Sequence, residues 1–141
     1  MNIFKSILNS FKKVIPVNIK VARQIKMSGL YKELILLSQD KTDFDFIGIT
    51  SNSYDCLYFK KEGNNYNIEF EAVEKTQIPY FEKIKSFAIR NNYTFVEEAN
   101  DGMPYLMIKT NTDIEQTIQL ARHIQNELFG NNENTVYDIV P

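Results

Sequence analysis

The strongest constraint on the fold is an alternation of apolar and polar side chains over residues 66–72. Tyr66, Ile68, Phe70 and Ala72 occupy every second position, and Asn67, Glu69 and Glu71 lie between them. A period of two places these two sets on opposite faces of a strand. The turn residues Glu62-Gly63-Asn64-Asn65 come first and predict a hairpin with a strand over residues 56–61. We expect Glu69 and Glu71 to face solvent and to pair with Lys60 or Lys61.

The remaining body of the chain repeats this pattern of a hairpin followed by a helix. Residues 44–49 predict a short strand, and Asp101-Gly102 predicts a second hairpin with strands over residues 93–98 and 105–110. Pro79 suits the first turn of a helix that continues to about Arg90. Thr112-Asp113-Ile114-Glu115 has the spacing of a capping box for a helix that ends at Gly130. Residues 135–140 predict a terminal extended segment.

The N-terminal region predicts helices. Apolar residues recur at helical spacing over residues 3–15, with lysines on the other side, and Pro16 ends the pattern. Residues 17–27 are more weakly periodic, and residues 30–37 predict a further helical segment. The candidate surface-binding helix consists of Ile3, Phe4, Lys5, Ile7, Leu8, Phe11, Lys12 and Lys13.

These elements predict one α+β domain over residues 1–141, with a helical region over residues 1–40 and an α+β body over residues 44–140. The expected order is helix, three strands, helix, two strands, helix. We expect an antiparallel sheet of about five strands in two hairpin units, with helices packed on one face.

The charge is unevenly distributed along the chain. Residues 1–32 contain seven basic residues and no acidic one, whereas the whole chain has a net charge of only −2. A basic arm of this kind can dock on its own acidic body or meet an anionic partner. We favour docking on the body or on a second copy, and a membrane surface is the alternative.

Composition also limits the compartment and the nucleic-acid alternative. Cys56 is the single cysteine, so no disulfide can form within the chain. No stretch reaches the roughly 18 apolar residues of a membrane-spanning helix, and we expect a cytoplasmic protein. The aromatic strand segments are acidic overall, which disfavours binding to nucleic acid.

No pattern of catalytic residues emerges from the sequence. His123, the single histidine, lies opposite the apolar stripe of its predicted helix, and Cys56 is expected to pack as a small apolar residue. Glu97, Glu98 and Asp101 lack the spacing of a calcium loop. We therefore expect no catalytic group, no metal and no cofactor.

The helix over residues 78–90 is apolar over a wider arc than one buried stripe requires. A helix of this kind is either deeply buried or also contributes to an interface. The candidate partner interface consists of Ile78, Tyr80, Phe87 and Ile89.

The order of elements, from the helical N-terminus to the helix beginning near Thr112, resembles the type III secretion chaperone-like fold. The resemblance covers nearly the whole chain and depends on element order and length. It implies a bacterial, chaperone-like or regulatory protein that is not an enzyme, often a homodimer, and that holds a partner polypeptide on a sheet face and apolar patches. Two alternatives stay open: a binder of membrane or anionic surfaces through residues 3–15, and a small-ligand or enzymatic domain with no recognisable motif.

Overall fold

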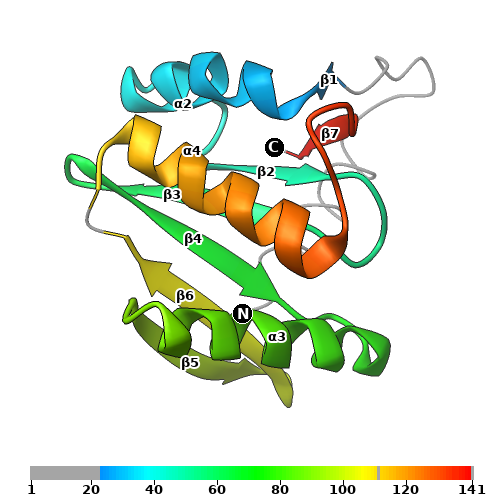
Figure 1. Cartoon of the computed structure of the whole chain (residues 1–141). Helices are drawn as coiled ribbons and strands as arrows, with labels where there is room; N and C mark the ends of the chain where they lie inside the picture. The colour runs from blue at the N-terminus through cyan, green and yellow to red at the C-terminus, as the bar shows by residue number, and fades with distance from the viewer. Residues whose placement is uncertain (1–22, 111, 141) are drawn as a thin grey trace.

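The computed structural model describes residues 23–110 and 112–140 and has the predicted α+β architecture. Its strands form one antiparallel open sheet in the order β1-β7-β2-β3-β4-β6-β5 (Figure 1). The seven strands are β1 (Gln24–Ile25), β2 (Phe46–Thr50), β3 (Leu57–Glu62), β4 (Asn65–Glu71), β5 (Thr94–Asn100), β6 (Met103–Lys109) and β7 (Tyr137–Val140).

Both predicted hairpins are confirmed, each with a two-residue turn. In the first, Glu62 pairs with Asn65, so Gly63 and Asn64 form the turn. In the second, Asn100 pairs with Met103 across Asp101-Gly102. Gly63 has a φ of 61°, and Asp101 and Gly102 have φ values of 53° and 77°. Glycine adopts this left-handed region without strain, which explains why these sequences turn here.

Three α-helices cover one face of the sheet (Figure 1). They are α2 (Leu30–Ser38), α3 (Ile78–Arg90) and α4 (Ile114–His123), and α4 continues into a π-helical segment, η3 (Ile124–Leu128). The 3₁₀ turns η1 (Met27–Gly29) and η2 (Lys75–Gln77) precede α2 and α3. The apolar residues of β4 pack in one core with Leu34, Phe81 and Ile118 from the three helices. The predicted packing of the helices that begin near Pro79 and Thr112 is therefore confirmed.

Several predicted details are wrong. The sheet has seven strands rather than five, because the terminal strand β7 inserts between β1 and β2. Gln24 and Ile25, expected in a helical stretch, pair instead with Asp138 and Tyr137. This pairing with the far end of the chain outweighs a weak local preference for helix.

The start of α4 also differs by one residue from the prediction. Asp113, and not Thr112, is the N-cap residue, and its carboxylate accepts a hydrogen bond of 2.9 Å from the backbone N–H of Gln116. The Thr112 hydroxyl instead contacts the Thr117 hydroxyl at 3.1 Å. Asp is a stronger N-cap residue than Thr, which explains why the helix begins after Asp113.

The predicted surface-binding helix lies outside the described residues. Ile3, Phe4, Lys5, Ile7, Leu8, Phe11, Lys12 and Lys13 all belong to this part of the chain. Within residues 23–110 and 112–140, no helix combines the length and the apolar character needed to cross a bilayer.

Candidate functional site

Three partly exposed aromatic rings form a stack at one end of the domain, which we call the aromatic row. Tyr54 stacks on Tyr80 with ring centroids 5.2 Å apart, and Tyr80 stacks on Phe129 at 5.5 Å. The Lys83 ammonium lies over the Tyr80 ring, 5.4 Å from its centroid. Phe129 also packs against the buried Phe70 at 6.1 Å, which anchors the row to the core. Rings from three separate segments thus form one surface.

A buried carboxylate, Asp55, fixes the loop that carries Tyr54. Asp55 is fully buried, and its carboxylate accepts hydrogen bonds from the Thr50 hydroxyl at 3.0 Å and the Asn131 amide at 2.9 Å. The backbone N–H groups of Ser51 and Asn52 donate to it at 2.8 and 3.2 Å, and the Ser51 hydroxyl is a further donor. The β2–β3 loop is therefore tied to the segment that follows η3.

Two glutamines connect this loop to the helical layer. The Gln77 side chain accepts hydrogen bonds from the backbone N–H of Val73 at 2.7 Å and donates to the backbone oxygen of Ser53. The Gln125 side chain donates to the backbone oxygen of Asp55 at 2.8 Å. These bonds hold the start of α3, and therefore Tyr80, against the loop that carries Tyr54.

Tyr54 and Asp55 were not among the predicted site residues. A signal was nevertheless present, because Asn52 forms an Asx turn in which its side-chain oxygen accepts from the N–H groups of Tyr54 at 2.7 Å and Asp55 at 3.1 Å. Asn in a short loop favours this kind of turn, because its side chain can bond to the backbone two residues further along the chain.

The structure separates the four residues of the predicted partner interface. Ile78 and Tyr80 are partly buried against the core, and Ile89 is 57% exposed. Phe87 is only 1% exposed and packs in the core, so its place in a surface patch was wrong. The wide apolar arc of α3 arises because the helix is deeply buried at Phe87 and contributes to the aromatic row at Tyr80.

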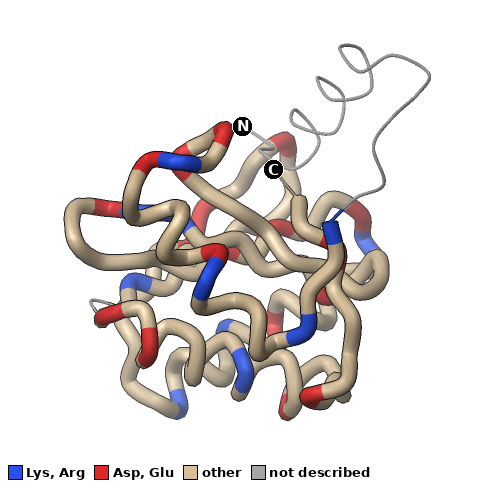
Figure 2. Tube along the Cα trace, turned by 90° about the horizontal axis from the view of Figure 1, so that it is seen from above, with Lys and Arg blue, Asp and Glu red and all other residues tan. Residues whose placement is uncertain are grey.

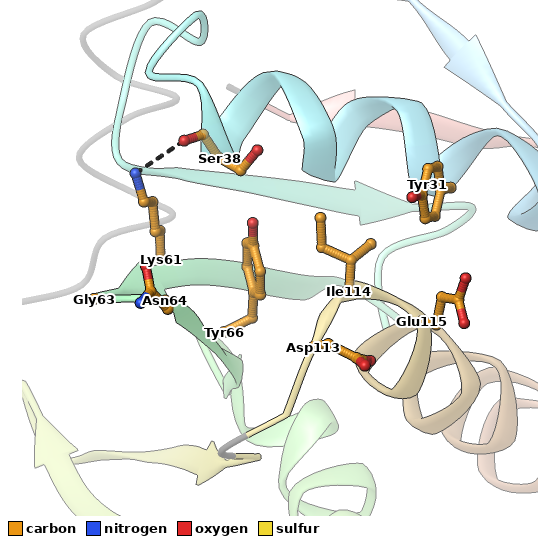
Figure 3. A pocket seen from close by; sticks show the side chains of 9 residues that line it. All are labelled: Tyr31, Ser38, Lys61, Gly63, Asn64, Tyr66, Asp113, Ile114 and Glu115. Atoms are coloured by element: carbon orange, nitrogen blue, oxygen red, sulfur yellow. Dashed lines mark hydrogen bonds between the residues drawn. The ribbon is translucent and has the colours of Figure 1, made fainter.

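A hollow lies between α2, the β3–β4 turn and the start of α4 (Figure 3). Its volume is about 540 Å³, and its lining includes Tyr31, Lys61 and Glu115. The Lys61 ammonium donates to the backbone oxygen of Ser38 at 3.1 Å, shown as the dashed line in Figure 3. Asp113, also in the lining, caps α4. Lys61 and Asp113 therefore hold secondary structure in place.

The face of the sheet opposite the three helices, which we call the open face, carries an unexpected cluster. Tyr58, Glu69, Glu71 and Tyr105 are 4, 3, 8 and 6% exposed, so the prediction that the glutamates face solvent was wrong. The register differs from the predicted pairing, because Lys60 stands opposite Asn67 and Lys61 opposite Tyr66, and Lys61 forms an ion pair with Asp40. Glu69 instead lies opposite Tyr58 and Met107.

The chemistry of this cluster follows from its burial. The Tyr105 hydroxyl donates a hydrogen bond to Oε1 of Glu69, and Oε2 of Glu69 is buried without a hydrogen bond. Burial raises the pKa of Glu69, while the hydrogen bond from Tyr105 and the charge of Lys60 lower it less. Burial also raises the pKa values of the Tyr58 and Tyr105 hydroxyls well above their usual range.

His123 and Cys56, the two other residues considered for catalysis, do not lie in a catalytic arrangement with described residues. His123 is exposed; its ring meets Phe87 edge-on with centroids 4.9 Å apart, and its Nε2 contacts Glu127. Burial raises the pKa of the Cys56 thiol well above its usual value, which lowers the fraction of the reactive thiolate.

The structure does not support the cation site considered for Glu97, Glu98 and Asp101. Glu97 forms an ion pair with Lys85 at 2.8 Å. Among the described residues, no group of three or more His, Cys, Asp or Glu side chains is arranged to hold a metal ion. Basic and acidic residues are interspersed along the described chain (Figure 2).

A scan against protein-family models finds no match, and searches of curated proteins and of solved structures also find none. The resemblance to the type III secretion chaperone-like fold therefore stays a prediction.

Proposed function

We propose that this protein is a non-enzymatic protein-binding module and that a partner polypeptide binds over the aromatic row. The observation that carries the proposal is the stack of Tyr54, Tyr80 and Phe129, which gathers three partly exposed rings from three segments. Tyrosine and other aromatic residues are enriched where protein interfaces gain most of their binding energy. Their rigid rings also lose little conformational entropy on binding.

The surroundings of the row favour an extended segment with apolar side chains and a nearby carboxylate. Lys83, which lies over the Tyr80 ring, also lines an adjacent groove of about 300 Å³ with Arg90 and Leu128. A peptide that crosses the row can continue into this groove and place an acidic residue beside Lys83 or Arg90. Anchoring of the loop by Asp55 supports the proposal further, because a preorganised surface loses less free energy on binding.

The polar groups present support binding better than catalysis. Lys61 and Asp113, in the hollow between α2 and α4, already make structural bonds, and burial raises the pKa of the Cys56 thiol. Burial raises the pKa of the Glu69 carboxyl, but this group is 3% exposed and does not line the hollow between α2 and α4. A chaperone-like role for the chain is part of the same proposal.

The experiment is quantitative affinity purification from the native organism with variants of the row. Wild type, Tyr54→Ala and Tyr80→Ala serve as baits, together with Tyr31→Ala as the matched control. Tyr31 is 47% exposed on α2, compared with 37% for Tyr54, and it does not belong to the row. We expect a partner protein to co-purify with wild type and with Tyr31→Ala, and to be lost from both Tyr54→Ala and Tyr80→Ala.

Folding must be checked for each bait by its melting temperature and circular dichroism. Equal recovery of every co-purified protein by all four folded baits would contradict the proposal. Turnover of a small substrate by the purified chain, abolished in a folded Glu69→Gln variant, would favour the enzymatic alternative instead.

A further inference from the structure

The open face carries polar side chains that are buried. The three helices lie on the other face of the sheet (Figure 1). Nevertheless, Tyr58 and Glu69 are 4 and 3% exposed. Glu69 also holds a buried carboxylate oxygen that accepts no hydrogen bond. A buried carboxylate is costly unless it is paired, so this position favours a cationic group.

The same face offers apolar surface beside the carboxylates. Phe44 stacks on Phe46 with centroids 5.4 Å apart, and Phe46 meets the edge of Tyr58 at 5.8 Å. Phe44 is 45% exposed, and Val96 on β5 is 36% exposed. An occupant of this face therefore needs both apolar side chains and positive charge.

We infer that the open face binds the basic N-terminal segment of this same chain, residues 1–22, through its lysines and its apolar side. The segment contains four lysines and no acidic residue, and its pattern predicts an amphipathic helix over residues 3–15. The rest of the chain has 12 basic and 18 acidic residues, so the charges are complementary. The inference concerns a different face from the aromatic row and does not depend on the proposed function.

The point where the segment joins the domain makes this docking feasible. The backbone oxygen of Arg23 accepts a hydrogen bond from the N–H of Ile139 at 2.8 Å, so Arg23, to which the segment is joined, lies beside β7. Four strand spacings separate β1 from β4, a distance of roughly 19 Å. Residues 16–22 can span up to roughly 25 Å when extended. A 13-residue helix over residues 3–15 would be about 20 Å long, enough to cross most of this face.

Photo-crosslinking in the full chain tests the position of the segment. A benzoylphenylalanine replaces Val96 on the open face or, as the control, Ile89, which is 57% exposed on α3. Val96 lies opposite Met107, which lies opposite Glu69. We expect irradiation to give an adduct of monomer mass between position 96 and residues 1–22, and none from position 89. An adduct from position 96 to a second chain, or none to residues 1–22, would overturn the inference.

The single cysteine provides a second readout of the same face. Cys56 is partly exposed and lies directly before β3, two residues from Tyr58. In a Lys5→Gln/Lys12→Gln/Lys13→Gln variant, we expect alkylation of Cys56 by N-ethylmaleimide to become about tenfold faster as the face opens. The charge-matched control replaces the exposed Lys26, Lys32 and Lys41 by Gln and should leave the rate unchanged.

Equal rates in wild type and both variants would count against docking. So would binding of the wild-type chain to phosphatidylserine vesicles without a crosslink from position 96, because the membrane would then be the site of the segment. Either result leaves the affinity of the aromatic row for a partner unaffected, so failure here is distinguishable from failure of the proposed function.

Discussion

Replacement of Asp55 by Ala tests the network that holds the aromatic row. The carboxylate is fully buried and accepts from two hydroxyls, two backbone N–H groups and the Asn131 amide. Asp55→Ala removes all of these acceptors at once and leaves a small cavity. The loop that positions Tyr54 then loses its main anchor.

The expected loss in the free energy of unfolding depends on the number of hydrogen bonds to Asp55 and on the exposure of their donors. Hydrogen bonds to a charged group contribute about 1.5–3 kcal/mol each, but the contributions of one network do not add. Ser51 and Asn52 are exposed, so their N–H groups can bind water after the substitution. We therefore expect a loss of about 3–5 kcal/mol in the free energy of unfolding, a large part of the ~5–15 kcal/mol typical of a domain.

Asp55→Asn should lose less, about 1–3 kcal/mol, because one side-chain oxygen remains as an acceptor. The new amide N–H₂ group on the other side would face the Asn131 amide, which is itself a donor. Urea unfolding followed by circular dichroism gives all the values, with Asp43→Ala as an exposed control expected within about 0.5 kcal/mol of wild type. A free energy of unfolding for Asp55→Ala within that same margin would refute the reasoning.

Two further predictions concern the packing of the sheet and the response to pH. A Cβ atom at Gly48 would lie 2.8 Å from the ring of the buried Tyr58, so Gly48→Ala should lower the free energy of unfolding by about 1–3 kcal/mol, and a neutral effect in urea unfolding would show that the ring can move. Burial raises the pKa of Tyr137 from its usual value of 10 to about 12. Because the folded-state pKa is the higher one, this contribution to stability is fully present below pH 10 and is lost as the pH rises through 12. Tyr137→Phe should lack this alkaline loss, and parallel stability curves for the two proteins between pH 9 and about 12 would contradict it.

The hairpins were predictable because their signals are local. Alternation over residues 66–72 defines a strand, and Asp101-Gly102 adopts the left-handed conformations that a tight turn needs. The insertion of β7 beside β2 was not predictable, because it pairs residues near Gly48 with Val140 at the other end of the chain. No short-range sequence pattern predicts a pairing between residues so far apart in the chain.

The alternation of apolar and polar residues distinguishes the two faces of a strand. It does not predict whether the polar face is exposed to water or buried. Ile68 was correctly expected in the core, while Glu69 was expected in water and is buried. Similarly, Phe87 was expected at a surface because α3 is apolar over a wide arc, and the same arc is typical of a deeply buried helix. Asp55 was missed because an acidic residue in a polar loop is usually solvated.

The most direct test of the proposed function is the dissociation constant of the purified partner for three forms of the protein. For an aromatic residue at the centre of an interface, truncation typically costs about 2 kcal/mol or more, which corresponds to roughly 30-fold in affinity. We therefore expect isothermal titration calorimetry to give about 30-fold weaker binding for Tyr80→Ala and an unchanged value for Tyr31→Ala. Equal dissociation constants for wild type and a folded Tyr80→Ala protein would contradict the assignment of the aromatic row as the binding surface.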